Sequence, residues 1–455
     1  MTSRHARTRS NRPEFFLALC LVVAVFVSVV GHHSDRNDLV RGLNIPTSAE
    51  STALYCTGIS GSAGTAPGIV TFFNTDAVDH VVTATVVPSR GTGFVSTFSV
   101  PAHGVTQMVP SQFPGSDYYT VSALIQGGGV TASVSFARNT TSVVPCVGEG
   151  SNQWYASGLS TRVGSDAILS IYNPTAGEDV VNITALSASG FSAPSSWQGL
   201  VVGAHTTTVV DLGVNVVNQS SVMINVRSQR GEVVAAALEV GNEGRTATSM
   251  LSGVDEPATA ASFPSATTEN ASQSNLEIAN PTNLPAIVAV TVTQPPYATQ
   301  TLNINVNSLS VTTLRVSPSS GVPAAGPAAL FVHSSTPVVT TLQTTSGSQS
   351  WLTSPTDAGT SQAMVDVTGQ GFASAAVVNS TSSAAHVTIW STNASGQHQS
   401  SVIVAAHATR ILSASALRGW TQGAAWIQSD QPVNISAVIG GPTGQANTQN
   451  ASGSR

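Results

Sequence analysis

The chain has 455 residues and a formal net charge of −6, and all 16 of its basic residues are arginine. Only 8% of its residues are charged, against about 25% in ordinary soluble domains. The absence of lysine excludes a P-loop lysine, a lysine Schiff base and a Ser-x-x-Lys acyl enzyme. Because no basic patch follows the N-terminal residues, the composition also argues against binding to nucleic acid.

The N-terminus predicts a membrane anchor. A basic tail, residues 1–14, is followed by an uncharged apolar run, residues 15–31. At about 1.5 Å per residue this run nearly spans a hydrocarbon core of about 30 Å. No small-x-small cleavage site follows it, so we expect an uncleaved signal-anchor helix rather than a cleaved signal peptide. The arginines before the run predict a single-pass protein of the cell membrane, with a cytoplasmic tail and a C-terminal ectodomain outside.

Residues 32–52 are predicted to form a polar stalk between this anchor and the ectodomain. The cysteines agree with export. Cys20 lies within the apolar run, and Cys56 and Cys146 are the other two. A pair without a CxxC motif is typical of an oxidising compartment, so we predict a structural disulfide between Cys56 and Cys146.

The strongest internal signal is a repeat of about one hundred residues. In each copy an asparagine ends a short apolar strand and begins a turn. Apolar residues lie two and four positions before it, and again eight and ten positions after it. This period of two is that of a strand with one buried face, and the fixed offsets predict a strand–turn–strand unit of constant register. The asparagines are Asn74, Asn173, Asn280 and Asn379.

Two further landmarks recur in each copy. The first is a turn that reads PAHGVT, GAHTTT and AAHATR, with NSLSVT in the third copy, where the histidine is missing. The second precedes the last strand, at Gly129-Val130, Glu232-Val233, Pro337-Val338 and Pro432-Val433. Short strands separated by Gly, Pro and Asn are typical of antiparallel sandwiches. We therefore expect a mainly β protein in which the signal anchor precedes four tandem immunoglobulin-like β-sandwich modules.

The module boundaries follow from these landmarks. The expected modules are residues 53–150, which would contain the disulfide, 151–256, 257–352 and 353–440. The stretch 257–268 is rich in Pro, Ala and Ser and is predicted to be a linker. The tail, residues 441–455, is rich in Gly, Asn and Ser and is predicted to be disordered.

Several residues are candidates for functional sites. The repeated asparagines are best explained as turn caps. One histidine per module, at His103, His205 and His407, does not provide the three or four ligands of a zinc site, so a turn role is favoured. Trp390 has solvent-face parity in its strand and is the candidate binding surface, as a stacking platform for sugar rings; the alternative is a contact between modules. We expect no catalytic residues, metal or cofactor.

The segments WYASGLSTR, LSIYNPT and VVNITAL, which begin at Trp154, Leu169 and Val180, carry a resemblance together with Cys56 and the anchor. On these features the chain resembles a family of uncharacterised single-pass envelope proteins from actinobacteria. The resemblance covers the first two modules best, through turn-type motifs. It implies an exported β-rich ectodomain, and it supplies no catalytic or binding residues.

The functional expectation is a non-enzymatic, membrane-anchored scaffold or binding protein of the cell envelope. It would contact wall glycan or an envelope protein through the faces or edges of its modules. One alternative is an envelope hydrolase or transferase with a site at a module interface. Another is a subunit of an envelope assembly or export complex.

Overall fold

The computed structural model describes residues 51–61, 67–113, 116–136, 143–242, 245–267, 272–294, 299–322, 326–346, 349–355, 360–366, 371–393, 396–413, 424–440, 446–450 and 452–454. The predicted cytoplasmic tail 1–14, the anchor 15–31 and the stalk up to residue 50 lie outside these ranges. Within them the chain is mainly β, as predicted, and no membrane-spanning helix is found. The first strand begins at Ser51, two residues inside the predicted stalk.

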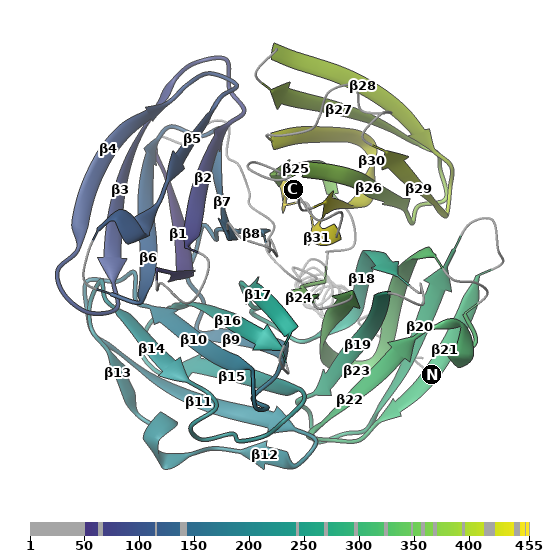
Figure 1. Cartoon of the computed structure of the whole chain (residues 1–455), viewed down its shortest axis with the longest axis horizontal. Helices are drawn as coiled ribbons and strands as arrows, with labels where there is room; N and C mark the ends of the chain where they lie inside the picture. The colour runs from purple at the N-terminus through teal and green to yellow at the C-terminus, as the bar shows by residue number, and fades with distance from the viewer. Residues whose placement is uncertain are drawn as a thin grey trace, which may run out of the picture. The chain divides into compact units, whose positions relative to one another are not determined.

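Segment 1, residues 51–145, contains two antiparallel sheets of four strands (Figure 1). Their strand orders are β1–β6–β3–β4 and β5–β2–β7–β8. The sheets pack face to face around one core, because alternate residues of each strand are apolar. The strands are β1 (Ser51–Ser60), β2 (Gly68–Asn74), β3 (His80–Pro88), β4 (Phe94–Val100), β5 (Val105–Met108), β6 (Tyr118–Gln126), β7 (Val130–Phe136) and β8 (Val143–Pro145), with a 3-10 turn η1 (Pro110–Gln112).

Segment 2, residues 153–251, pairs its strands in the equivalent order. One sheet is β12–β11–β15–β9, with β13 also paired to β11, and the other begins β14–β10–β16–β17. The strands are β9 (Gln153–Leu159), β10 (Asp166–Tyr172), β11 (Asp179–Ser187), β12 (Gly190–Ser192), β13 (Leu200–Val202), β14 (Thr207–Asp211), β15 (Val222–Ser228), β16 (Val234–Asn242) and β17 (Arg245–Leu251), with η2 (Ser195–Trp197) between β12 and β13.

Segment 3, residues 258–353, differs in one respect: its long strand β23 belongs to both sheets. Strands β18 and β20 pair with the first half of β23, and β19 and β24 with the second half. A single parallel pair, Thr246 with Gln349, connects β17 to β24. The strands are β18 (Ala258–Thr267), β19 (Ser272–Asn280), β20 (Ala286–Thr293), β21 (Gln300–Val306), β22 (Ser310–Val316), β23 (Pro327–Ser346) and β24 (Gln349–Thr353), with η3 (Pro318–Ser320).

Segment 4, residues 360–454, repeats this arrangement with β30 as the shared strand. One sheet runs β28–β27–β30–β25–β32, and β26, with β29 beside it, pairs with the second half of β30. The strands are β25 (Thr360–Asp366), β26 (Gly371–Asn379), β27 (Ala385–Asn393), β28 (Gly396–Val404), β29 (Ala408–Ser413), β30 (Ala424–Gly440), β31 (Ala446–Asn450) and β32 (Ser452–Ser454).

The four repeated asparagines make the same hydrogen bonds. Each is fully buried and lies at the end of its strand. In Asn173, Nδ2 donates to the carbonyl of Gly177 at 2.7 Å and to that of Val202 at 3.0 Å, while Oδ1 accepts from the amide of Thr175 at 2.9 Å. Asn74, Asn280 and Asn379 make the equivalent three contacts. The side chain therefore ties its own turn to a second strand, which explains why the register is constant.

The predicted core positions are buried. The residues eight positions after each asparagine are at most 1% exposed: Val82, Val181, Val288 and Val387. The landmark that precedes the last strand of each copy is the point where the chain crosses from one sheet to the other. Its valines are at most 3% exposed: Val130, Val233, Val338 and Val433.

Two predictions from composition differ from the structure. The stretch predicted as a linker forms β18, in which Pro264 lies at a register shift between Phe263 and Ala266. A bulge tolerates proline because no ladder hydrogen bond is required there. In the tail predicted to be disordered, β31 pairs with β30 and β32 pairs with β25. The edge of a strand can form backbone hydrogen bonds with a segment of any sequence, so amino-acid composition does not predict this pairing.

The predicted disulfide is confirmed. Cys56 of β1 is bonded to Cys146, which directly follows β8, and their Cα atoms are 4.6 Å apart. Both cysteines are buried in the core of segment 1. Because β1 and β8 belong to different sheets, the bond holds the two sheets of the segment together.

Neighbouring segments also share packed contacts. The core cluster of segment 1 includes Ile168 and Leu238 of segment 2, and Thr57 Oγ1 lies 2.9 Å from Ser170 Oγ. Between segments 2 and 3, a smaller apolar cluster contains Tyr155 and Ala279. Segments that bury apolar side chains against one another are coupled energetically as well as covalently.

Candidate binding surface

Trp390 lies on the outer face of its sheet, as its parity predicts. In β27 the alternate residues Ala385, Val387 and Ile389 are at most 2% exposed and pack in the core of segment 4. Trp390 points to the opposite face and is half-buried. A half-buried indole has part of its ring in solvent and part held by neighbours, which fixes its orientation.

The neighbours of Trp390 come from the two adjacent strands. By register, Trp390 is opposite Gln399 of β28 and Trp426 of β30. Two residues earlier in β27, on the same face, Thr388 is opposite Ser401 and Gln428. Gln399, Ser401 and Gln428 are exposed. The face around the indole thus offers amide and hydroxyl groups, which both donate and accept hydrogen bonds.

A charged residue lies next to this face, beyond Thr388. Asp430 is exposed, and its Oδ1 accepts a hydrogen bond of 2.7 Å from the backbone amide of His386. His386 is also exposed and is opposite Ile403, which is 53% exposed. We refer to Trp390, Thr388, Gln399, Ser401 and Gln428 as the Trp390 face.

The repeated histidines lie in turns. His103, His205 and His407 have left-handed backbones with φ of 51°, 53° and 52°. Each belongs to a different segment, so the structure does not bring them together. Among the described residues, no group of three or more His, Cys, Asp or Glu side chains is placed to hold a metal ion.

The adjacent carboxylates of segment 2, Glu178 and Asp179, lie in different environments. Glu178 is exposed, whereas Asp179 is 1% exposed. Asp179 Oδ2 accepts from Ser228 Oγ at 2.5 Å, and Oδ1 accepts from the amides of Val180 at 2.7 Å and Arg230 at 3.2 Å. With its acceptors already used, Asp179 holds the turn between β15 and β16.

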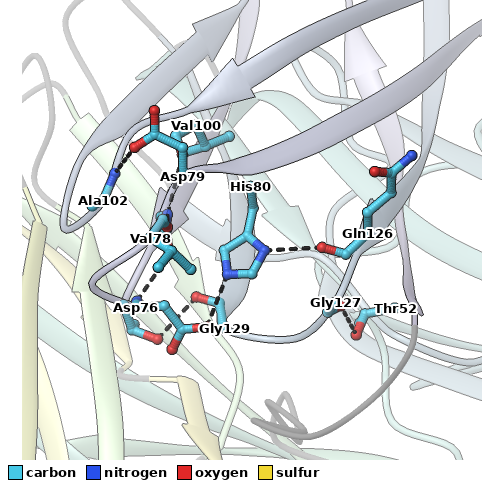
Figure 2. Close-up of polar contacts among 12 residues, drawn as sticks. Thr52, Asp76, Val78, Asp79, His80, Val100, Ala102, Gln126, Gly127 and Gly129 are labelled. Carbon is cyan, nitrogen blue, oxygen red and sulfur yellow. Dashed lines mark hydrogen bonds and ion pairs between the residues drawn. The ribbon is translucent and has the colours of Figure 1, made fainter.

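A polar cluster in segment 1 had no signal in the sequence (Figure 2). The ring of His80 lies between two acceptors: Nδ1 is 2.9 Å from the carbonyl of Gln126, and Nε2 is 2.9 Å from Asp76 Oδ2. Nearby, Asp79 Oδ1 accepts from the amide of Ala102 at 2.8 Å. The cluster joins the start of β3 to the turn after β6. Such a cluster is found only once the strands are paired, because Gln126 is 46 residues from His80.

The comparisons with known proteins give a family and no activity. Residues 137–415 match a family described as a family of unknown function, DUF5719. No curated protein sequence matches the chain.

Five solved chains match it, and two of them are as follows. The crystal structure of Thermotoga maritima 1070 shows 20% identity and a TM-score of 0.21, covering 22% of this chain and 94% of that one. The crystal structure of a tetra-tandem repeat in the extending region of a large adhesion protein shows 15% identity and a TM-score of 0.12, covering 88% of this chain and 98% of that one.

Proposed function

This chain belongs to the DUF5719 family, and we propose that it is a non-catalytic, membrane-anchored scaffold or binding protein of the cell envelope. The apolar run 15–31 would anchor it, and the four segments would stand outside the membrane as tandem immunoglobulin-like sandwich modules. The strand order common to the segments supports the modular part of this proposal. The actinobacterial source and the single-pass topology in this proposal rest on the resemblance in sequence.

The ligand we propose is wall glycan, bound at the Trp390 face. The observation that carries this proposal is an oriented, half-buried indole surrounded by exposed amide and hydroxyl side chains. A sugar ring has an apolar C–H face and a rim of hydroxyl groups. The first matches an aromatic surface, and the second matches groups that both donate and accept hydrogen bonds.

The charge pattern of the face favours a neutral ligand. Trp390, Thr388, Gln399, Ser401 and Gln428 carry no charge. A face built for a charged protein partner would offer complementary charges, which steer association and set specificity. Neutral groups in a shallow face suit a long polymer, because many weak contacts along a repeating chain add up.

The test is co-sedimentation of the full chain, kept in mild detergent, with purified cell-wall sacculi from a high-GC Gram-positive bacterium. We expect saturable pelleting that Gln399→Ala weakens and Trp390→Ala abolishes. Trp390→Phe should retain part of the binding, since it keeps an aromatic face. Phe191→Ala is the matched control, because Phe191 is 58% exposed on β12 of segment 2.

Two results would count against the proposal. One is the absence of saturable pelleting of the wild-type chain. The other is pelleting that Trp390→Ala and Phe191→Ala reduce equally, which would show non-specific adhesion. Because Gln399 is exposed, the Gln399→Ala variant tests the face without disturbing the core.

A further inference from the structure

Strand β4 is an edge strand without the usual protection. Among the described strands it pairs with β3 alone. Its sequence, FVSTFSV, has no charge, no proline and no glycine. Natural edge strands are usually blunted by charged residues, proline, bulges or short length, because their free backbone groups recruit other strands.

The equivalent edges of segments 2 and 3 are protected or polar. In segment 2 the edge is divided into two strands of three residues, β12 and β13, with η2 between them. In segment 3 the outward residues of β21 include Asn303 and Asn305, which are exposed. Strand β4 combines length with an apolar outer residue, Val95, which is 68% exposed.

The direction in which the backbone groups of β4 point follows from one hydrogen bond. The carbonyl of Ser99 accepts a hydrogen bond of 3.1 Å from Thr106 Oγ1 of β5, so it points away from β3. Backbone groups of alternate residues in a strand point to the same side. The N–H and C=O groups of Thr97 and Val95 therefore also face away from β3, toward the open edge.

The outer face of the same sheet is apolar beside this edge. Leu124 is 52% exposed and Val81 is 38% exposed. They lie around Thr83, which pairs with both Leu124 and Thr97. Exposed aliphatic side chains that adjoin an open edge are typical of a surface that is covered by a partner.

We propose that β4 pairs with β4 of a second copy of this chain, in an antiparallel ladder centred on Thr97. In that register Thr97 faces its own counterpart, and Val95 faces Ser99 of the second copy. The carbonyl of Ser99 would accept from Val95 through the lone pair that Thr106 Oγ1 does not use. The pairing is self-complementary: apolar residues oppose small polar ones, and no like charges meet. A two-fold interface of this kind uses the same strand twice and extends the four-stranded sheet to eight strands across the dimer.

The test uses the full chain in a Cys20→Ser background, so that an introduced cysteine is the only thiol outside the disulfide. Paired residues of two antiparallel strands lie about 4.5–5.5 Å apart at Cα, within reach of a disulfide. We expect Thr97→Cys to form a covalent dimer rapidly under mild oxidation. Asn303→Cys, at the equivalent place in β21, is the control and should cross-link at least about tenfold more slowly.

Sedimentation velocity of the chain in detergent provides a second readout. We expect the unmodified chain to form dimers, and Val95→Lys to weaken the association by about tenfold or more, since it places a charge in the ladder. Val95 is 68% exposed, so this variant should unfold at the same temperature as the wild type. A monomeric wild-type chain, or equal cross-linking at residues 97 and 303, would overturn the proposal.

Discussion

Leu309 has the same left-handed backbone conformation as His103, with φ of 49° against 51°. Their amides donate equivalent hydrogen bonds across the turn, to the carbonyl of Thr282 at 3.1 Å and of Asp76 at 3.0 Å. His205 and His407 occupy the same place. The turn therefore requires positive φ in all four segments. Histidine adopts this region more readily than leucine does, which accounts for a histidine in three copies.

Leu309→Asn or Leu309→His should stabilise segment 3. A left-handed leucine costs about 1–2 kcal/mol, and Leu309 is already 36% exposed, so little packing is lost with it. We expect a gain of about 0.5–1 kcal/mol in the free energy of unfolding. Urea unfolding measures it, and the reciprocal change His103→Leu should destabilise. A loss of stability in Leu309→Asn would show that the leucine packs more strongly than its exposure indicates.

Replacing a repeated asparagine should be costly. Asn173→Ala removes two donors and an acceptor from a fully buried turn and leaves the carbonyls of Gly177 and Val202 without those bonds. We expect a loss of about 2–4 kcal/mol, since each buried polar group left unsatisfied costs about 1–3 kcal/mol. Thermal unfolding measures it. Asn303→Ala on the surface of β21 is the control and should change stability by less than about 0.5 kcal/mol.

Removing the disulfide should affect more than segment 1. Cys56→Ser with Cys146→Ser should lower stability by about 2–5 kcal/mol, because the bond closes a loop of 90 residues. The core of segment 1 includes Ile168 and Leu238, so segment 2 should be weakened as well. Scanning calorimetry should show a shift in the transition of both segments. A shift confined to segment 1 would mean that the shared contacts contribute little.

Glu277 should make the stability of segment 3 sensitive to pH. Burial raises the pKa of Glu277 from 4.5, while the hydrogen bond that its carboxylate accepts from Thr313 opposes part of that shift. Because its pKa is raised in the folded state, the stabilisation from Glu277 is full below about pH 4.5 and is lost as pH rises through the folded value. Glu277→Gln should stabilise the chain at neutral pH and flatten this dependence in unfolding curves from pH 4 to 8. An unchanged profile would contradict it.

The sequence predicts the buried positions well because the pattern is local. The offsets around Asn74 and its equivalents report the strand period, and they place Val82 and Val181 in the core as observed. Amino-acid composition predicts the structure less well than this local pattern does. Residues 258–267 have the composition of a linker and residues 446–450 that of a disordered tail, yet both form strands because an adjacent strand offers them a backbone ladder.

The candidate surface was only partly predictable. Parity places Trp390 on the outer face. Its neighbour Gln399 comes from the next strand of a hairpin, but Gln428 is brought beside it by pairing with β30, about forty residues further along. The His80 cluster depends on contacts of the same kind. No local pattern encodes which strand lies next to which, so a site assembled across strands is visible only in the fold.

The shared strands of segments 3 and 4 have a consequence for local opening. In segments 1 and 2 the chain turns between the two sheets, at residues 127–129 and 229–233, whereas β23 and β30 pass from sheet to sheet without a break. When the backbone hydrogen bonds at one end of β23 or β30 open, the same strand transmits this opening to the other sheet. Amide protons of both sheets in these two segments should therefore exchange with solvent together, while each sheet of segments 1 and 2 exchanges at its own rate.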